Sequence, residues 1–178
     1  WSGSTRAWCG VSSTRLGDLL VARGLLTPVQ RAAALVQQRR TGERLGRVLL
    51  TMGFVSRVDL ARTLAAQWGR EFVLVEPTMV DPVAARRFPL DATMSFRAVP
   101  LTDDGTTVVV ASAEEPQPAL IETLEVVYPG RALDIRITTE WDIDRAISVT
   151  HRRQLVDASI YGLYFRDQAE SAYTVFTP

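Results

Sequence analysis

Two arginines begin two similar segments of this sequence, and a glutamine ends each segment. Residues 15–38 read RLGDLLVARGLLTPVQRAAALVQQ, and residues 44–67 read RLGRVLLTMGFVSRVDLARTLAAQ. A guanidinium group can bind an anion through two parallel hydrogen bonds or stack on a purine, and an amide can both donate and accept. The segments therefore predict a pair of equivalent polar binding positions.

The two segments form an internal repeat with a period of 29 residues. They align without gaps over 24 positions, and five residues separate them. The nine identical pairs are Arg15/Arg44, Leu16/Leu45, Gly17/Gly46, Leu20/Leu49, Gly24/Gly53, Val29/Val58, Ala32/Ala61, Leu35/Leu64 and Gln38/Gln67. A fixed period of this size marks a repeated supersecondary unit. Two copies favour a pseudo-two-fold unit over a solenoid, and such a unit suits a ligand with two equal halves.

Packing alone would explain the identity of some of these pairs but not of others. Leu20/Leu49, Val29/Val58 and Leu35/Leu64 would be core positions in any helical hairpin, so a duplicated structural hairpin remains an alternative to a ligand-binding pair. Packing does not require arginine and glutamine at the same offset twice. Each R-L-G step precedes a helix whose first backbone N–H groups can receive an anion, and its glycine lets a ligand approach the main chain.

The sequence offers no set of residues for catalysis or metal binding. It contains no lysine, so a Walker A loop cannot form, and its glycines do not form G-x-G-x-x-G. The single histidine, His151, and the single cysteine, Cys9, leave no partners for a metal site or an internal disulfide. We therefore predict no catalytic residue, no metal and no cofactor in this chain.

The formal net charge of zero hides an uneven distribution. Residues 1–70 carry 11 arginines against three acidic residues, a balance of +8, whereas residues 71–144 carry five arginines against 14, a balance of −9. The first half is thus expected to attract an anion. The lone cysteine and the lack of an apolar run of ~18 residues favour a cytoplasmic location. A start at Trp1 suggests a piece of a larger protein.

Hydrophobic spacing predicts four short helices in the first half. Gly24 and Gly53 are expected to end the first helix of each copy in a left-handed conformation. Thr27 and Ser56 are expected to cap the second helices. The apolar face expected for the second helix of the first copy comprises Val29, Ala32, Ala33, Leu35 and Val36.

The second half is expected to alternate strands and helices. We predict a strand at 72–75, a helix at 83–88, a hairpin of 97–101 and 106–111, a helix at 118–127, a strand at 131–137 and a helix at 141–149. The predicted fold class is α+β, with a four-helix subdomain made of two repeated helical hairpins and a small α/β subdomain. The expected boundaries are 1–14 for a leader or linker, 15–70 for the helical subdomain, 71–150 for the α/β subdomain and 151–178 for a tail.

The doubled motif resembles the MshEN domain, the N-terminal regulatory module of type II secretion and type IV pilus ATPases, which binds cyclic di-GMP. The resemblance is close over residues 15–67 and looser to about residue 150. It implies that each motif holds one half of the dinucleotide. The residues implied for the first half are Arg15, Leu16, Gly17, Leu20, Leu35 and Gln38; those for the second are Arg44, Leu45, Gly46, Leu49, Leu64 and Gln67.

The resemblance also implies an acidic contact from the α/β subdomain. The family usually has Asp-Pro in an A-x-x-[acid]-P stretch, and this chain has Glu115-Pro116 there. The implied function is a non-catalytic cyclic di-GMP sensor that relays its signal to an effector in the rest of the parent chain. The effector could be a secretion or pilus ATPase or a glycosyltransferase. The alternative is a module that docks a membrane-anchored assembly protein without nucleotide; no DNA or RNA polymer is expected as partner.

Overall fold

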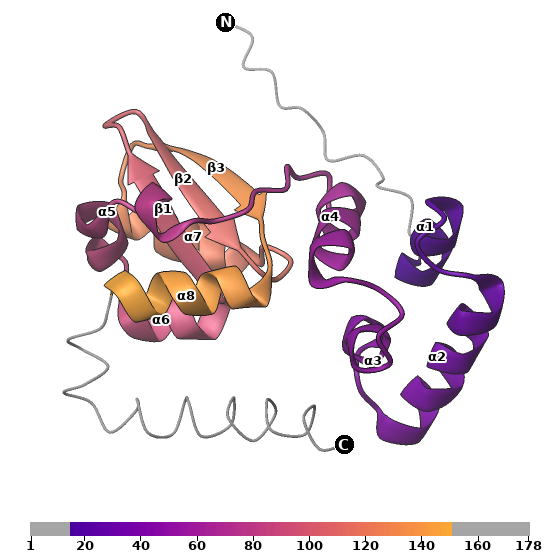
Figure 1. Cartoon of the computed structure of the whole chain (residues 1–178). Helices are drawn as coiled ribbons and strands as arrows, with labels where there is room; N and C mark the ends of the chain where they lie inside the picture. Colours follow the sequence, from indigo (N-terminus) through magenta and orange to yellow (C-terminus); the bar gives the residue numbers. More distant parts are fainter. Residues whose placement is uncertain (1–14, 151–178) are drawn as a thin grey trace, which may run out of the picture.

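The computed structural model describes residues 15–150, so the expected leader (1–14), the expected tail (151–178) and His151 lie outside the described residues. The first half of this range consists of four helices: α1 (Leu16–Ala22), α2 (Pro28–Thr41), α3 (Leu45–Thr51) and α4 (Arg57–Gln67). Figure 1 shows them gathered on one side of a three-stranded sheet, with α4 nearest to it. The predicted α+β class and the four helices are confirmed.

The two sequence copies adopt the same backbone conformation at corresponding positions. Arg15 and Arg44 are extended N-cap residues of α1 and α3, with φ/ψ of −63/138° and −64/140°. Thr27 and Ser56 cap α2 and α4, and their hydroxyls accept from the N–H groups of Gln30 and Asp59 at 3.2 Å and 3.1 Å. The glycines that follow α1 and α3 have φ of 69° and 65°, which favours glycine. The sequence repeat is therefore a repeat of structure.

One apolar core joins the four helices. Leu20 and Leu49 are completely buried at its centre, and Val48 and Ala34 lie beside them. Because α1 and α3 have seven residues each, they are too short to be stable alone and depend on this shared core.

Helix α2 contributes less to the core than its sequence predicts. Ala34 is its only residue in the cluster, whereas Val29 is 78% exposed and Val36 is 50% exposed. The expectation that Val29 and Leu35 are core residues was wrong: Leu35 is half-buried and lies outside the cluster. In the second copy, Ala65, the counterpart of Val36, is 1% exposed. The difference arises because α4 packs on α1 and also on the sheet, whereas α2 packs mainly on α3.

The second half comprises three strands with helices on both faces. Strand β1 (Ala98–Asp103) pairs antiparallel with β2 (Thr107–Ser112), and β2 pairs in parallel with β3 (Ala132–Ile137). Helix α7 (Pro118–Val127) makes the crossover between β2 and β3. The other helices described in this half are α5 (Pro82–Arg87), α6 (Leu90–Phe96), α8 (Glu140–Thr150) and a short 3-10 helix at Pro77–Met79. Pro100 stands in β1 at the edge of the sheet, where a missing N–H is tolerated, and the register shifts next to it.

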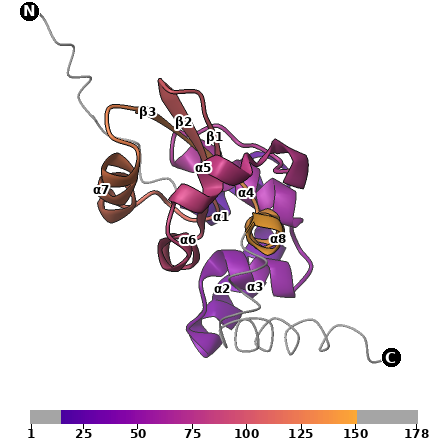
Figure 2. The same ribbon diagram turned by 90° about the vertical axis from the view of Figure 1, so that its left-hand side faces the viewer.

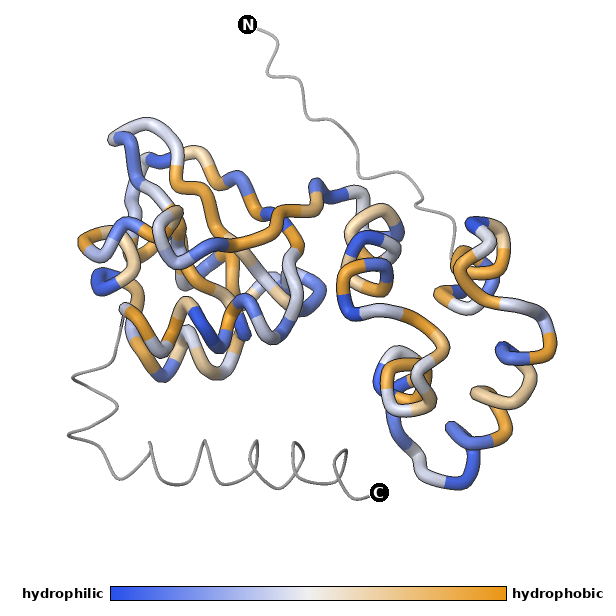
Figure 3. Tube along the Cα trace, viewed as in Figure 1, coloured by the Kyte–Doolittle hydropathy of each residue, from blue (hydrophilic) through white to orange (hydrophobic). Residues whose placement is uncertain are grey.

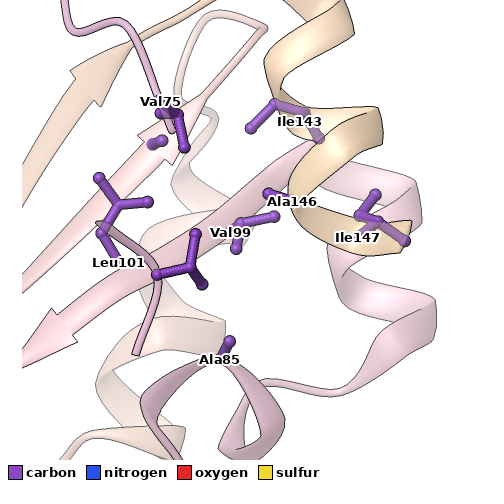
Figure 4. Close-up of a cluster of buried hydrophobic side chains, with 9 residues drawn as sticks. Val75, Ala85, Val99, Leu101, Ile143, Ala146 and Ile147 are labelled. Atoms are coloured by element: carbon purple, nitrogen blue, oxygen red, sulfur yellow. The ribbon is translucent and has the colours of Figure 1, made fainter. Parts of the chain in front are cut away.

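Each face of the sheet has its own core. On one face, Val99 and Leu101 pack against Ile143 and Ile147 of α8 (Figure 4). On the other face, Val108, Val110 and Ile135 pack against Leu120 and Leu124 of α7. Figure 2 shows α7 and α8 on opposite sides of the sheet, and Figure 3 shows hydrophobic stretches along the strands. Apolar residues alternate between the two faces of β2, as a strand requires.

Two predictions in this half differ from the structure. Residues 72–75 do not form a strand: Phe72 makes a single bridge to Ile137, and the chain then turns to bury Val75 against α8. Helix α6 was not predicted. Its C-cap residue is Arg97, which has a φ of 50°. A glycine usually occupies such a position and signals the end of a helix, but the sequence has an arginine here.

The hairpin turn between β1 and β2 is stabilised by Asp104. Its Oδ1 accepts from the hydroxyl and N–H of Thr106 and from the N–H of Thr107, at 2.7–2.8 Å. These hydrogen bonds lower the pKa of Asp104 to about 2, and the one from the Thr106 hydroxyl has the largest effect. The predicted Asp-Asp-Gly turn is thus held by a carboxylate that stays charged at neutral pH.

The helical half meets the sheet next to the last residue of β3. The N–H of Val73 donates to the carbonyl oxygen of Ile137 at 2.8 Å, and the N–H of Ile137 donates to that of Glu71 at 2.7 Å. The guanidinium of Arg62 on α4 lies 5.2 Å from the centre of the Phe72 ring. The subdomain boundary near residue 70 remains a prediction, and this is the segment in which it would fall.

The unequal burial of the repeat predicts unequal costs of truncation. Leu20→Ala and Leu49→Ala should each lower the free energy of unfolding by about 2–5 kcal/mol, because each leaves a cavity in a shared core. Val29→Ala should change it by less than about 0.5 kcal/mol, because that side chain is mostly in solvent. Urea unfolding followed by circular dichroism measures all three; equal losses for Val29 and Leu20 would contradict the described packing.

Candidate functional site

The two motif arginines occupy equivalent exposed positions. Arg15 and Arg44 each precede a helix by one residue, and neither helix has a side-chain N-cap. The side chain of Arg44 is 86% exposed. Both guanidinium groups are therefore accessible to a ligand.

The beginnings of the two motifs touch each other. A Cβ atom placed on Gly46 would lie 3.8 Å from Cδ2 of Leu16, so the leucine of the first R-L-G step packs over the glycine of the second. Helices α1 and α3 are neighbours in the helical core. Although 29 residues separate the motifs in sequence, their starting points form one continuous region.

The space next to each motif glycine is occupied by the following helix. A Cβ on Gly17 would lie 3.1 Å from Nε of Arg31, and a Cβ on Gly46 would lie 3.3 Å from Cδ2 of Leu60. Both distances are shorter than an ordinary van der Waals contact. The glycines are thus explained by close helix packing, in addition to the ligand approach that the sequence suggested.

The motif leucines divide into core residues and partly exposed ones. Leu20 and Leu49 are 0% exposed, so they support the motifs and have no surface for a ligand in this structure. Leu16, Leu45 and Leu64 pack at the edge of the core and retain some exposure. Apolar contact with a ligand would come from this second group and from Leu35.

The closing glutamines have different environments. Gln38 lies within α2, three residues before its end, whereas Gln67 is the last residue of α4. Oε1 of Gln67 is buried and has no hydrogen-bond partner. An unpaired buried acceptor costs about 1–3 kcal/mol, so a ligand donor that reached this atom would recover that free energy.

An acidic residue of the second half lies beside Arg44. Oε1 of Glu114 is 3.7 Å from Nη1 of Arg44. The loop that carries Glu114 is fixed by Ser112, whose hydroxyl donates to the Glu114 carbonyl oxygen at 2.9 Å and accepts from the Glu114 N–H at 3.3 Å. Glu115, the acidic residue expected from the sequence, is exposed next to it. Both carboxylates line a hollow of about 270 Å³ between α6 and the start of α7.

Two residues at the site were missed from the sequence. Glu114 was passed over in favour of its neighbour because only the structure shows which carboxylate faces Arg44. Arg31 is not among the identical positions of the repeat, because its counterpart in the second copy is Leu60. A signal was present, since an arginine aligned with a core leucine is a departure within the repeat.

Metal sites and membrane-spanning helices were two further possibilities for the described residues. Between residues 15 and 150, no group of three or more His, Cys, Asp or Glu side chains could hold a metal ion. Within the same range, no helix is both long and apolar enough to cross a membrane.

Known proteins resemble this chain in sequence. The model of the MshEN domain matches residues 68–155. Type IV pilus assembly ATPase PilB of Thermus thermophilus is 33% identical over 117 residues, which are 65% of this chain and 13% of that protein. PilB of Myxococcus xanthus is 25% identical over 135 residues, which are 76% of this chain and 24% of that protein. The chain thus spans no more than about a quarter of these relatives.

Solved structures also resemble it. A structure of MshE with cyclic di-GMP is 29% identical and has a TM-score of 0.63; the match covers 75% of this chain and 96% of that one. This coverage is larger than residues 68–155, so the likeness extends beyond the segment that the family model matches. The N-terminal domain of XpsE, 19% identical with a TM-score of 0.56 over 76% of this chain and 93% of its own, shares the fold.

The chain is thus similar in sequence to part of two type IV pilus ATPases, and it shares its fold with MshE and with the N-terminal domain of XpsE. The predicted likeness is confirmed, and the segment that the family model matches is the α/β half, which seemed the looser match from sequence alone. Residues 68–155 thus resemble the MshEN domain, and the chain resembles MshE in fold.

Proposed function

We propose that this domain binds one molecule of cyclic di-GMP across its two motifs. The observation that carries the proposal is the contact of Leu16 with Gly46, because it brings the starts of both motifs into one region. Cyclic di-GMP has two identical halves, and the repeat supplies two backbones of the same conformation. The similarity to a structure of MshE with cyclic di-GMP supports the same ligand here.

Each proposed contact has a chemical reason. Arg15 and Arg44 would bind phosphate oxygens or stack on guanine, and Leu16, Leu35, Leu45 and Leu64 would contact bases and ribose. Gln38 and Gln67 would bond to polar edges, and the main chain at Gly17 and Gly46 would lie against the ligand. Leu20 and Leu49 remain in the site as buried supports of the motifs.

The acidic side of the site would select guanine. A carboxylate only accepts hydrogen bonds, and guanine offers donors at N1 and N2, whereas the ring nitrogen N1 of adenine is an acceptor. We assign this role to the Glu114–Glu115 pair. Glu114 lies beside Arg44, which supports Glu114 as the residue of the pair that would contact the base.

The signal would pass to an effector in the parent chain. The chain covers 13% and 24% of two type IV pilus ATPases, so we propose a cytoplasmic ATPase of that kind as the effector. Binding would regulate it only if the ligand prefers one arrangement of the helices and the sheet over another. The Arg44–Glu114 pair, which joins the two halves, is the contact that a ligand would have to replace or bridge.

A docking module is the second candidate. The apolar surface of α2 favours it, because Val29 and Val36 are exposed where a helix of this core would normally be covered. The partner would be a membrane-anchored assembly protein. In that case the motif arginines would be dispensable for partner binding.

We expect the chain to bind cyclic di-GMP with one-to-one stoichiometry and to bind cyclic di-AMP more weakly. The reason is a continuous site with two equivalent halves and an acidic group for guanine. Isothermal titration calorimetry gives both the stoichiometry and the affinity. A stoichiometry of two, or no heat and no thermal shift at saturating ligand, would exclude the proposed site.

Arg15→Ala and Arg44→Ala should each weaken binding by about 1.5–3 kcal/mol, the range of a hydrogen bond to a charged group. The melting temperature should stay near that of the parent, because both side chains are exposed. Arg57→Ala, at an exposed position on α4 outside the motif identities, is the matched control and should bind like the parent. If all three variants bind equally, the R-L-G steps do not hold the ligand.

Glu114→Gln should reduce the preference for cyclic di-GMP over cyclic di-AMP by roughly 5- to 10-fold, because a neutral amide accepts less strongly and also presents a donor. Glu115→Gln makes the same change of charge one residue away. Titration of both variants with both dinucleotides compares them directly. A larger effect at Glu115 would assign the acidic contact to that residue instead.

A further inference from the structure

The two motifs differ at a position that lies against the R-L-G step. Arg31 in the first copy aligns with Leu60 in the second, and Asp18 aligns with Arg47. Elsewhere in the step the copies agree, since Arg15, Leu16 and Gly17 recur as Arg44, Leu45 and Gly46. The first copy therefore has a cation and an anion where the second has a leucine and an arginine.

The structure shows that Arg31 and Leu60 fill the same space in different ways. Nε of Arg31 is 3.1 Å from a Cβ placed on Gly17, and Cδ2 of Leu60 is 3.3 Å from a Cβ placed on Gly46. Leu60 is 8% exposed and belongs to the core. The Arg31 side chain is 35% exposed, and its Nη2 is 2.7 Å from Oδ1 of Asp18. A guanidinium thus reaches solvent at the point where the second copy has a buried leucine.

We infer that Arg31 is an additional anion-binding residue of the first half-site and that Asp18 is its positioning residue. This inference rests on the proposed binding of cyclic di-GMP. Filling the space beside the glycine does not require an arginine, because Leu60 does so in the second copy. A guanidinium has five N–H donors in a planar fork, so Arg31 can keep one contact with Asp18 and offer others to a phosphate.

The consequence is that two identical halves of the ligand meet two unequal half-sites. The first half-site has Arg15 and Arg31 with the anion Asp18, whereas the second has Arg44, with Leu60 at the position of Arg31 and Arg47 at the position of Asp18. Asp18 acts in two directions: it holds the guanidinium of Arg31 in place, and its own negative charge opposes a phosphate nearby. Asp18→Asn keeps an oxygen that can accept from Arg31 and removes the opposing charge, so it should strengthen binding, whereas an ion pair remote from the ligand would give no such gain.

The alternative is that the Arg31–Asp18 pair only fastens α1 to α2. Ion pairs between partly exposed side chains contribute little to stability, so this role alone would leave ligand binding almost unchanged on removal. The two readings predict different results for affinity and for its salt dependence. Melting temperature reports the structural role separately.

The test is isothermal titration of the full 178-residue chain with cyclic di-GMP, at two salt concentrations. Arg31→Leu copies the second motif into the first and should weaken binding by roughly 5- to 10-fold, with a smaller loss at high salt. Asp18→Asn should tighten binding by roughly 2- to 5-fold at low salt. Arg39→Leu makes the same change of charge at an exposed position farther along α2 and should leave affinity near that of the parent.

The possible outcomes separate this inference from the proposal on which it rests. If the parent chain does not bind cyclic di-GMP, both fail. If the parent binds and Arg31→Leu matches Arg39→Leu, only the role of Arg31 is overturned. If Arg31→Leu melts at a lower temperature, Arg31→Lys decides, because it keeps the charge but loses the planar fork. An affinity between those of the parent and the leucine variant supports the inference. An affinity equal to that of the parent contradicts it.

Discussion

The close approach of α1 and α3 is the constraint on which the rest of the helical half depends. Both helices have seven residues, and neither could persist without burying its central leucine against the other. That approach requires a residue without a side chain at Gly46, where Leu16 and Leu60 pack. The same packing brings the two motif starts together, so the fold and the proposed site have one physical origin.

This arrangement separates the motif into two kinds of residue. Leu20 and Leu49 are identical in the two copies because they fill a shared core. Arg15 and Arg44 are identical although no contact in the core requires them, and they stand in solvent. Sequence identity in a repeat therefore has two different causes here, and only burial distinguishes them.

Local signals predicted most elements but failed where tertiary contacts decide. Caps and periodicity identified the four helices, the hairpin and α7, because turn residues such as Thr27 and Asp104 act within a few positions of themselves. Residues 72–75 have the composition of a strand but find only one partner residue. Val29 has the periodicity of a core residue, but the sheet covers α4 and not α2. At the site, sequence could name the doubled motif, but which of two adjacent glutamates faces Arg44 depends on how the halves pack.

The bridge at Ile137 has a mechanical consequence. The backbone of residues 71 and 73 bonds to the N–H and the carbonyl oxygen of Ile137, respectively. The chain before residue 71 contributes to the helical core, and the chain from residue 73 contributes to the core between the sheet and α8. A small tilt of the four helices that kept the bridge intact would have to be taken up before it, for example around Gly69, whose φ is 63°. A larger tilt must break two backbone hydrogen bonds together. A movement that broke both hydrogen bonds would therefore be a switch between two discrete positions.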